Sequence, residues 1–138
     1  MPSLPSRSPR RDDAPASPGR RARGRKAPEP KLRVWVLYNG RIKFGHGRAD
    51  FLQAVSERGS IRGAATEFGM SYRNAWGYLR ELEEAAGARL LLRQRGRGAG
   101  AGTRLSPEGE AFLARYRTFR AAVDRAVDRE FRRIYGSG

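Results

Sequence analysis

The folded part of the chain begins with a short pattern of apolar and polar residues that predicts a β-hairpin. Residues 33–38 (Arg-Val-Trp-Val-Leu-Tyr) and 41–44 (Arg-Ile-Lys-Phe) are rich in β-branched and aromatic side chains. Asn39 and Gly40 lie between these runs, and this pair favours a tight turn in which both central residues adopt a positive φ. We therefore expect two antiparallel strands before the first helix.

Past residue 47 the apolar residues recur about every 3.6 positions, which is the period of an α-helix. The spacing predicts three helices, over residues 48–58, 61–68 and 72–86, and a glycine follows each of them. Ser60 and Ser71 precede the second and third helices, where a serine hydroxyl can accept a free backbone N–H. The residues expected to face inward are Ala49, Phe51, Leu52 and Val55 in the first helix, Ile61, Ala64, Ala65 and Phe68 in the second, and Ala75, Leu79 and Leu82 in the third.

A second hairpin and one long helix are expected in the last third of the chain. Residues 89–93 favour a strand, and residues 103–105 favour its return. Ser106 and Pro107 then form a good helix start, because proline at the first helical position has no N–H that needs a partner. This helix is expected to run to about Ile134. The predicted fold class is therefore mainly α with a small amount of β.

The long helix carries apolar residues at alternating spacings of four and three. Such a heptad-like stripe favours pairing with a second copy of the chain. The alternative is that the helix packs back on its own domain. The residues expected at a dimer interface are Phe112, Tyr116, Phe119, Val123 and Val127.

Residues 60–76 show the helix-turn-helix pattern, in which two short helices meet at a tight turn. Ala64 and Ala65 are small enough for the helices to cross closely, and Gly69 supports a sharp turn. The first turn of the second helix is polar, as is needed to reach base edges in the major groove of DNA. A helical hairpin with no role in DNA binding is the alternative.

The polar side chains at the start of the third helix suit base recognition, because arginine pairs with guanine and asparagine with adenine. Trp76, one position from the inward stripe, is interpreted as a core or hinge aromatic rather than a base contact. Gly77 costs about 1 kcal/mol relative to alanine in a helix, and close approach of DNA or of another helix would explain it. The expected contacts are Tyr72, Arg73 and Asn74 with bases, Ser60, Arg62 and Ser71 with phosphates, and Arg95, Arg97 and Arg104 with the backbone or minor groove.

The second hairpin has a basic, glycine-rich tip. Residues 89–104 hold five arginines and no acidic residue, and every second residue from 96 to 102 is glycine. Glycine lets the backbone approach a phosphate or enter a minor groove, so we interpret the hairpin as a wing; a flexible, solvated loop is the alternative. The run lacks the Gly-x-x-x-x-Gly-Lys spacing of a nucleotide-binding loop. The third helix, which precedes this hairpin, holds three acidic residues in its C-terminal half: Glu81, Glu83 and Glu84. Phosphate would repel them, so this half of the helix should point away from DNA.

Composition narrows the classes of function. The 138 residues include 29 Lys plus Arg and 14 Asp plus Glu, a formal net charge of +15 that favours a polyanionic partner. There is no cysteine, and the single histidine, His46, is expected to be a plain loop residue. A metal site, a cofactor and a catalytic triad are therefore not expected. No apolar run approaches the roughly 20 residues of a membrane span and no signal segment is visible, so we expect an intracellular protein that is not an enzyme.

The first 30 residues differ from the rest, since they hold seven of the eight prolines and a basic cluster between residues 20 and 26. Such a segment buries too little apolar surface to become ordered. A disordered tail is expected, which acts either as a linker or as an arm that binds nucleic acid non-specifically. The expected division is a tail over 1–30, a winged helix-turn-helix domain over 31–105 and a C-terminal dimerisation helix over 106–138.

Residues from about 33 to 118 resemble the N-terminal DNA-binding domain of the molybdate-responsive ModE-type regulators. More broadly, the helical layout is similar to the winged helix of LysR-type regulators. The resemblance implies a winged helix-turn-helix transcription factor that dimerises through its long terminal helix and whose recognition helix begins at Ser71. The matching motifs are Phe-Gly-His-Gly-Arg at 44–48, Gly-Ser-Ile at 59–61 followed by the alanines at 64–65, Gly-Met-Ser-Tyr-Arg-Asn-Ala-Trp at 69–76 and Leu-Ser-Pro-Glu-Gly at 105–109.

Two features depart from that family. The wing alternates glycine with arginine or alanine where the family has Gly-Gly pairs, and 138 residues leave no room for the family's molybdate-binding domain. We therefore expect a homodimeric, cytoplasmic and nucleoid-associated regulator that binds specific sites in double-stranded DNA, with a separate effector-sensing protein as a further partner that the sequence allows. Its two recognition helices should meet successive major grooves about 34 Å apart. The alternative is a basic nucleoid- or RNA-associated protein that binds without sequence choice.

Overall fold

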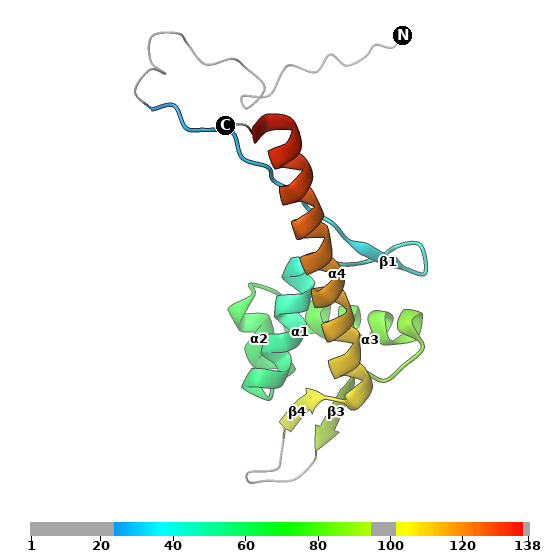
Figure 1. Cartoon of the computed structure of the whole chain (residues 1–138). Coiled ribbons are helices and arrows are strands. Elements are labelled where there is room, and N and C mark those ends of the chain that lie inside the picture. Colours follow the sequence, from blue (N-terminus) through cyan, green and yellow to red (C-terminus); the bar gives the residue numbers. More distant parts are fainter. Residues whose placement is uncertain (1–23, 95–101, 137–138) are drawn as a thin grey trace, which may run out of the picture.

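The computed structural model describes residues 24–94 and 102–136 of the chain. Two antiparallel hairpins and four α-helices follow one another along this part of it (Figure 1). The predicted fold class, mainly α with a small amount of β, is confirmed, and so are the N-terminal hairpin and the long C-terminal helix. The elements are β1 (Val36–Tyr38), β2 (Ile42–Phe44), α1 (His46–Arg58), α2 (Ile61–Glu67), α3 (Tyr72–Ala86), β3 (Leu91–Gln94), β4 (Gly102–Leu105) and α4 (Pro107–Phe131), which continues into a π-helical turn (Arg132–Gly136).

The first hairpin pairs β1 with β2 in antiparallel register, with Tyr38 opposite Ile42. Asn39 has a φ of 57° and Gly40 a φ of 70°, so positive φ occurs at the two positions where the turn chemistry predicts it. Residues 33–35 were expected in the first strand but lie outside the sheet. The reason is the length of β2, which has three residues and therefore offers no partner to them.

The helices α1 to α3 lie close to the predicted ranges. The first begins at His46, two residues earlier than expected, so His46 is a helical residue rather than a loop residue, and its Nε2 lies 3.4 Å from Asp50 Oδ2. The hydroxyls of Ser60 and Ser71 each accept a hydrogen bond from the backbone N–H three residues on, at 2.8 and 3.0 Å. Both predicted N-caps are confirmed.

One hydrophobic core joins both hairpins and the four helices of the described chain. Of the residues expected to face inward from α1, α2 and α3, all are buried except Phe68. The helix α2 ends at Glu67, so Phe68 belongs to the turn, where it is 36% exposed. Its ring still meets the edge of Phe51, with 5.7 Å between the centroids, so it closes the rim of the core.

The start of α4 is held against the second hairpin by Ser106, which is buried. Its hydroxyl accepts from the N–H of Gly109 at 2.9 Å and donates to the carbonyl of Arg89 at 2.6 Å. Its own N–H donates to the carbonyl of Leu90 at 2.8 Å. A Cβ on Gly109 would collide with that same carbonyl. Both carbonyls thus bond to the N-cap of α4, and β3 begins at Leu91, two residues later than predicted.

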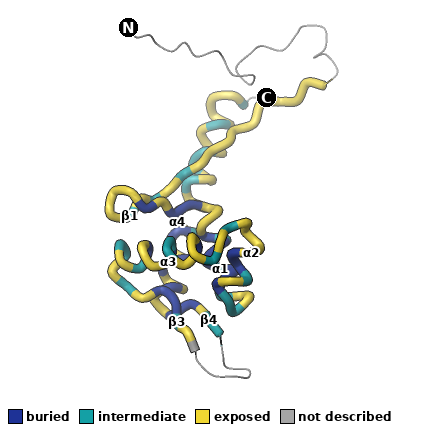
Figure 2. The backbone as a smooth tube through the Cα atoms, turned by 180° about the vertical axis from the view of Figure 1, so that it is seen from behind, coloured by how far each residue is buried: buried dark blue, intermediate teal, exposed yellow. Residues whose placement is uncertain are grey.

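The helix α4 packs on the domain only along its first part and then projects beyond it (Figure 1). Its buried residues all lie between Gly109 and Tyr116, and Figure 2 shows the change to exposed residues further along. An extended segment before β1 runs beside the projecting part (Figures 1 and 2). Arg120 Nη2 donates to the carbonyl of Leu32 there, at 3.3 Å.

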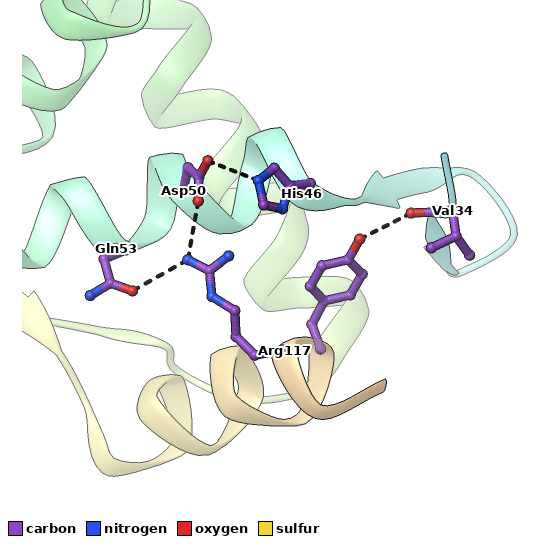
Figure 3. Close-up of polar contacts among 6 residues, drawn as sticks. Val34, His46, Asp50, Gln53 and Arg117 are labelled. Atoms are coloured by element: carbon purple, nitrogen blue, oxygen red, sulfur yellow. Dashed lines mark hydrogen bonds and ion pairs between the residues drawn. The ribbon is translucent and has the colours of Figure 1, made fainter. Parts of the chain in front are cut away.

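Polar contacts tie the base of α4 to α1 and to the segment before β1 (Figure 3). Arg117 Nη2 lies 3.2 Å from Asp50 Oδ1 and 3.4 Å from Gln53 Oε1, both on α1. The hydroxyl of Tyr116 donates to the carbonyl of Val34 at 3.1 Å. These contacts fix the direction in which α4 leaves the domain.

Candidate nucleic-acid interface

The helix α3 presents an outward row that includes Arg73, Gly77 and Arg80. Residues three and four apart share one face of a helix, and this face lies opposite the buried residues of α3. Both arginines are exposed. A Cβ on Gly77 would meet no atom within 4 Å outside its own helix turn, so no neighbouring helix explains this glycine. The open face leaves the helix backbone accessible to a partner.

The N-terminal ends of α2 and α3 carry six of the predicted contacts: Ser60, Arg62, Ser71, Tyr72, Arg73 and Asn74. Ser60 and Ser71 are the N-caps, and each hydroxyl that accepts a cap bond keeps a proton that it can donate to a phosphate oxygen. The guanidinium of Arg62 lies 4.2 Å from the centroid of the Tyr72 ring. This cation–π contact joins a residue predicted to bind phosphate with one predicted to contact a base. It holds the arginine at the start of α3.

Trp76 lies at the surface and not in the core. It is 41% exposed, and the guanidinium of Arg80 lies 5.1 Å from its ring centroid. We interpreted Trp76 as a core or hinge aromatic, and the core part of that interpretation is therefore wrong. Successive residues of a helix are turned by about 100°, and one such step from the buried Ala75 brings the indole out of the core.

A cleft of about 440 Å³ runs between α3 and the wing. Trp76, Arg80, Arg89 and Arg93 are among its lining residues. The sequence prediction had not placed these three arginines in the interface. Helical spacing from Arg73 could have found Arg80, and the purely basic charge of the wing segment could have found the other two.

Glu83 fastens the wing to α3. Its Oε2 accepts hydrogen bonds from the N–H of Leu90 at 2.8 Å and from the N–H of Leu91 at 3.1 Å. The carboxylate is half-buried, and backbone N–H groups of the protein itself are its hydrogen-bond donors. Hydrogen bonds to a charged acceptor are among the strongest in proteins, so this residue positions the strand that carries Arg93.

The other strand of the wing is fastened to the turn between α1 and α2. The N–H of Thr103 donates to the carbonyl of Gly59 at 3.0 Å. Gly102 has a φ of +123°, and a Cβ there would come within 2.9 Å of that carbonyl, so glycine is needed for the close approach. Arg104 follows and is exposed. The remaining predicted wing contacts, Arg95 and Arg97, lie outside the described residues and stay predictions.

The arginines of this surface are not neutralised by carboxylates within residues 24–94 and 102–136. The ion pairs found there join other cations, such as Arg58 with Glu67 at 2.7 Å and Arg117 with Asp50 at 3.2 Å. Arg62, Arg73 and Arg80 are in none of them. Unpaired guanidinium groups suit a partner that offers phosphate oxygens and base acceptors.

The five residues expected at a dimer interface do not form one surface. Phe112 and Tyr116 are 5% and 3% exposed and belong to the core of their own domain, so they cannot contact a second copy in this structure. Phe119 is 43% exposed, and Val123 and Val127 are half-buried on the projecting part of α4. The candidate dimer stripe is therefore restricted to these three residues.

Two other features were not found in the part of the chain that the structure describes. No group of three or more His, Cys, Asp or Glu side chains there is arranged to hold a metal ion. None of the described helices combines the length and the apolar character needed to cross a bilayer.

Two helices that meet at a tight turn, with a β-hairpin wing beside them, define a winged helix-turn-helix. Residues 48–110 match the family of bacterial regulatory helix-turn-helix proteins of the LysR family. Within this segment the chain is similar to the LysR-type helix-turn-helix, and the resemblance found in the sequence is confirmed.

Two similar proteins are named for molybdenum. The molybdenum-pterin-binding protein MopB of Rhodobacter capsulatus is 34% identical over 88 residues, which cover 64% of this chain and 33% of that protein. The molybdenum transport protein ModE of Azotobacter vinelandii is 32% identical over 87 residues, which cover 63% of this chain and 32% of that protein. The chain thus spans about a third of the length of these relatives.

Solved structures of regulators with DNA are also similar to this chain. The complex of the CbnR DNA-binding domain with DNA is 28% identical, with a TM-score of 0.47, and the match covers 62% of this chain and 93% of that one. The complex of the BenM DNA-binding domain with the catB site 1 DNA is 26% identical, with a TM-score of 0.45, and covers 61% and 85%.

Proposed function

We propose that this chain is a transcriptional regulator that binds a specific site in double-stranded DNA. The LysR-type helix-turn-helix and the similarity to the ModE protein support this function. The observation that carries it is the outward row on α3, with Arg73 and Arg80 exposed and Gly77 between them, beside a cleft lined by wing arginines. A protein that bound DNA through its net charge alone would not need an ordered helix that presents this row of residues.

In this mechanism α3 enters the major groove. Arg73 can donate two hydrogen bonds to guanine, and Asn74 can pair with adenine in the same bidentate way. Gly77 lets the helix backbone come close to the bases, while Tyr72 orients Arg62 at the edge of the groove. The residues assigned to phosphates are Ser60, Arg62, Ser71, Arg89, Arg93 and Arg104.

A homodimer formed through α4 completes the proposal. Phe119, Val123 and Val127 would pack against the same residues of a second copy, because a two-fold interface uses the same patch on both subunits. The two α3 helices would then read half-sites about 34 Å apart, in successive major grooves.

The proposed activity is DNA binding alone, with no catalytic step and no cofactor. The proposed location of the protein is the cytoplasm, where it binds DNA. The proposed division keeps a tail over 1–30, the winged helix-turn-helix over 31–105 and the dimerisation helix over 106–138. A separate effector-sensing protein could bind this regulator and supply the signal.

Selection of bound duplexes from a random DNA pool tests the proposal with the full 138-residue chain. We expect enrichment of one site with two-fold symmetry, because a symmetric dimer favours a palindrome. A pool that shows no enrichment would refute sequence-specific binding. Repeating the selection with molybdate tests whether this chain itself responds to that anion.

A further inference from the structure

A second basic surface lies on the other side of α3 from the wing. In both views the β1–β2 hairpin lies above α3, and β3 and β4 lie below it (Figures 1 and 2). A cleft of about 610 Å³ opens between this hairpin, the start of α1 and α4, and no acidic residue of the described chain lines it. Trp35 and Phe68 are its aromatic lining residues, and its charged lining consists of Arg33, Lys43, His46, Arg48 and Arg120.

Most of the positive charge in this cleft is not compensated by the fold. Arg33, Lys43 and Arg48 form no ion pair with any carboxylate of residues 24–94 and 102–136. The histidine and the arginine of α4 differ, because they pair with Asp50 at 3.4 Å and with Asp124 at 3.0 Å. The cleft therefore suits an anionic partner, with three cations available to it.

Tyr78 connects two of these cations to the recognition helix. Its hydroxyl donates to the carbonyl of Lys43 at 2.8 Å, and the guanidinium of Arg48 lies 4.7 Å from its ring centroid. Asn74 lies one helical turn before Tyr78, on the same side of α3. A DNA strand that passes beside Asn74 would therefore run next to these two cations.

The ammonium of Lys43 is also held in place. Its Nζ lies 4.8 Å from the ring centroid of Trp35, a cation–π distance. Trp35 is itself 51% exposed, so the stacked ammonium stays at the surface. Both Lys43 and Arg48 thus rest on aromatic rings. These rings hold the charged groups in place without neutralising them.

We propose that Lys43 and Arg48 bind backbone phosphates of the DNA strand that borders the major groove on the side away from the wing. This inference rests on the proposed function, in which α3 occupies that groove. The major groove is about 12 Å wide, with a sugar-phosphate strand along each border. A helix inside it therefore has one strand beside each flank. The wing serves one strand, and the first hairpin with the start of α1 serves the other.

Salt dependence of binding tests the inference with the full chain and the selected duplex. We compare the wild type with a Lys43→Gln/Arg48→Gln variant and with a matched Arg125→Gln/Arg132→Gln variant. The latter pair is exposed on the projecting helix and its π-helical turn, so it loses the same charge away from the groove. Each phosphate contact contributes about 0.9 to the slope of log K against log salt.

We expect the Lys43/Arg48 variant to lower that slope by about 1.8 and to weaken binding about tenfold or more at 0.1 M salt. Selected and shuffled duplexes should weaken alike, because phosphates carry no base identity. Arg48→Lys keeps the charge and should retain the slope, which separates a lost contact from lost packing on Tyr78. An unchanged slope in the double variant, or an equal loss in the matched variant, overturns the inference. A wild type without preference for the selected duplex would overturn the proposed function as well.

Discussion

Replacing Glu83 by alanine removes the carboxylate that joins the recognition helix to the wing. Two backbone N–H groups, those of Leu90 and Leu91, lose an acceptor at 2.8 and 3.1 Å, and both residues are buried. A buried donor without a partner costs about 1–3 kcal/mol. Because Glu83 is only half-buried, water can reach part of the vacated site. We therefore expect the free energy of unfolding to fall by about 2–4 kcal/mol.

Urea denaturation of the full chain, followed by circular dichroism, measures this loss. Glu81→Ala is the matched control, because Glu81 is an exposed carboxylate on the same helix and surface substitutions change stability by about 0.5 kcal/mol or less. Glu83→Gln keeps an acceptor oxygen and should lose less than the alanine variant. A loss below about 0.5 kcal/mol for Glu83→Ala, or equal losses in both alanine variants, would refute this account of the wing.

Three further substitutions separate base reading, dimerisation and core packing. Arg73→Ala should weaken binding to the selected duplex by about 1–3 kcal/mol and relax the preference at one base pair, as measured by fluorescence anisotropy on single-base variants of the site. Phe119→Glu should give a folded monomer, since Phe119 is 43% exposed and lies outside the core; sedimentation measures its mass. Phe112→Ala should lower stability by about 3–5 kcal/mol, because its ring packs against Phe44 with centroids 4.9 Å apart; thermal denaturation checks it.

Each of these expectations has a contrary result. An equal loss of affinity for all base variants would show that Arg73 contacts the backbone instead of a base. Ala121→Glu adds the same charge at an exposed position of the same helix, turned about 200° from Phe119, and should leave the dimer intact. A Phe119→Glu protein that stays dimeric would place the interface elsewhere. A loss below about 1 kcal/mol for Phe112→Ala, well under the usual cost of a buried aromatic ring, would contradict its place in the core.

Features that depend on neighbouring residues could be predicted from the sequence. The caps at Ser60 and Ser71 and the positive φ values at Asn39 and Gly40 involve residues within three positions of one another, so local chemistry decides them. The cation–π contact between Arg62 and Tyr72 is different, because it joins two helices. Its formation depends on the angle at which those helices cross, which residue spacing does not determine.

The apolar stripe of the long helix shows the same limit. Along the sequence, Phe112, Tyr116 and Phe119 continue one heptad-like pattern. In the structure the ring of Phe44 meets both Phe112 and Tyr116 edge-on, so the first hairpin covers that end of the stripe and leaves Phe119 outside it. A periodic pattern identifies an apolar face, but where a helix leaves its domain depends on contacts with strands far away in the chain.

The helix α4 behaves as a lever with a rigid base. Its 25 residues span about 37 Å at about 1.5 Å per residue, and Tyr116 and Arg117, near its middle, attach it to the rest of the domain. In a dimer joined through Phe119, Val123 and Val127, the middle of the contact lies about 24 Å from the start of α4, so a tilt of about ten degrees would move the domain there by about 4 Å, roughly one base-pair step. A stiff attachment resists that tilt, so the loss of affinity on inserting one base pair between the half-sites measures its stiffness. A molecule bound at the C-terminal end of α4 could thus shift the α3 helices along the duplex without contacting them.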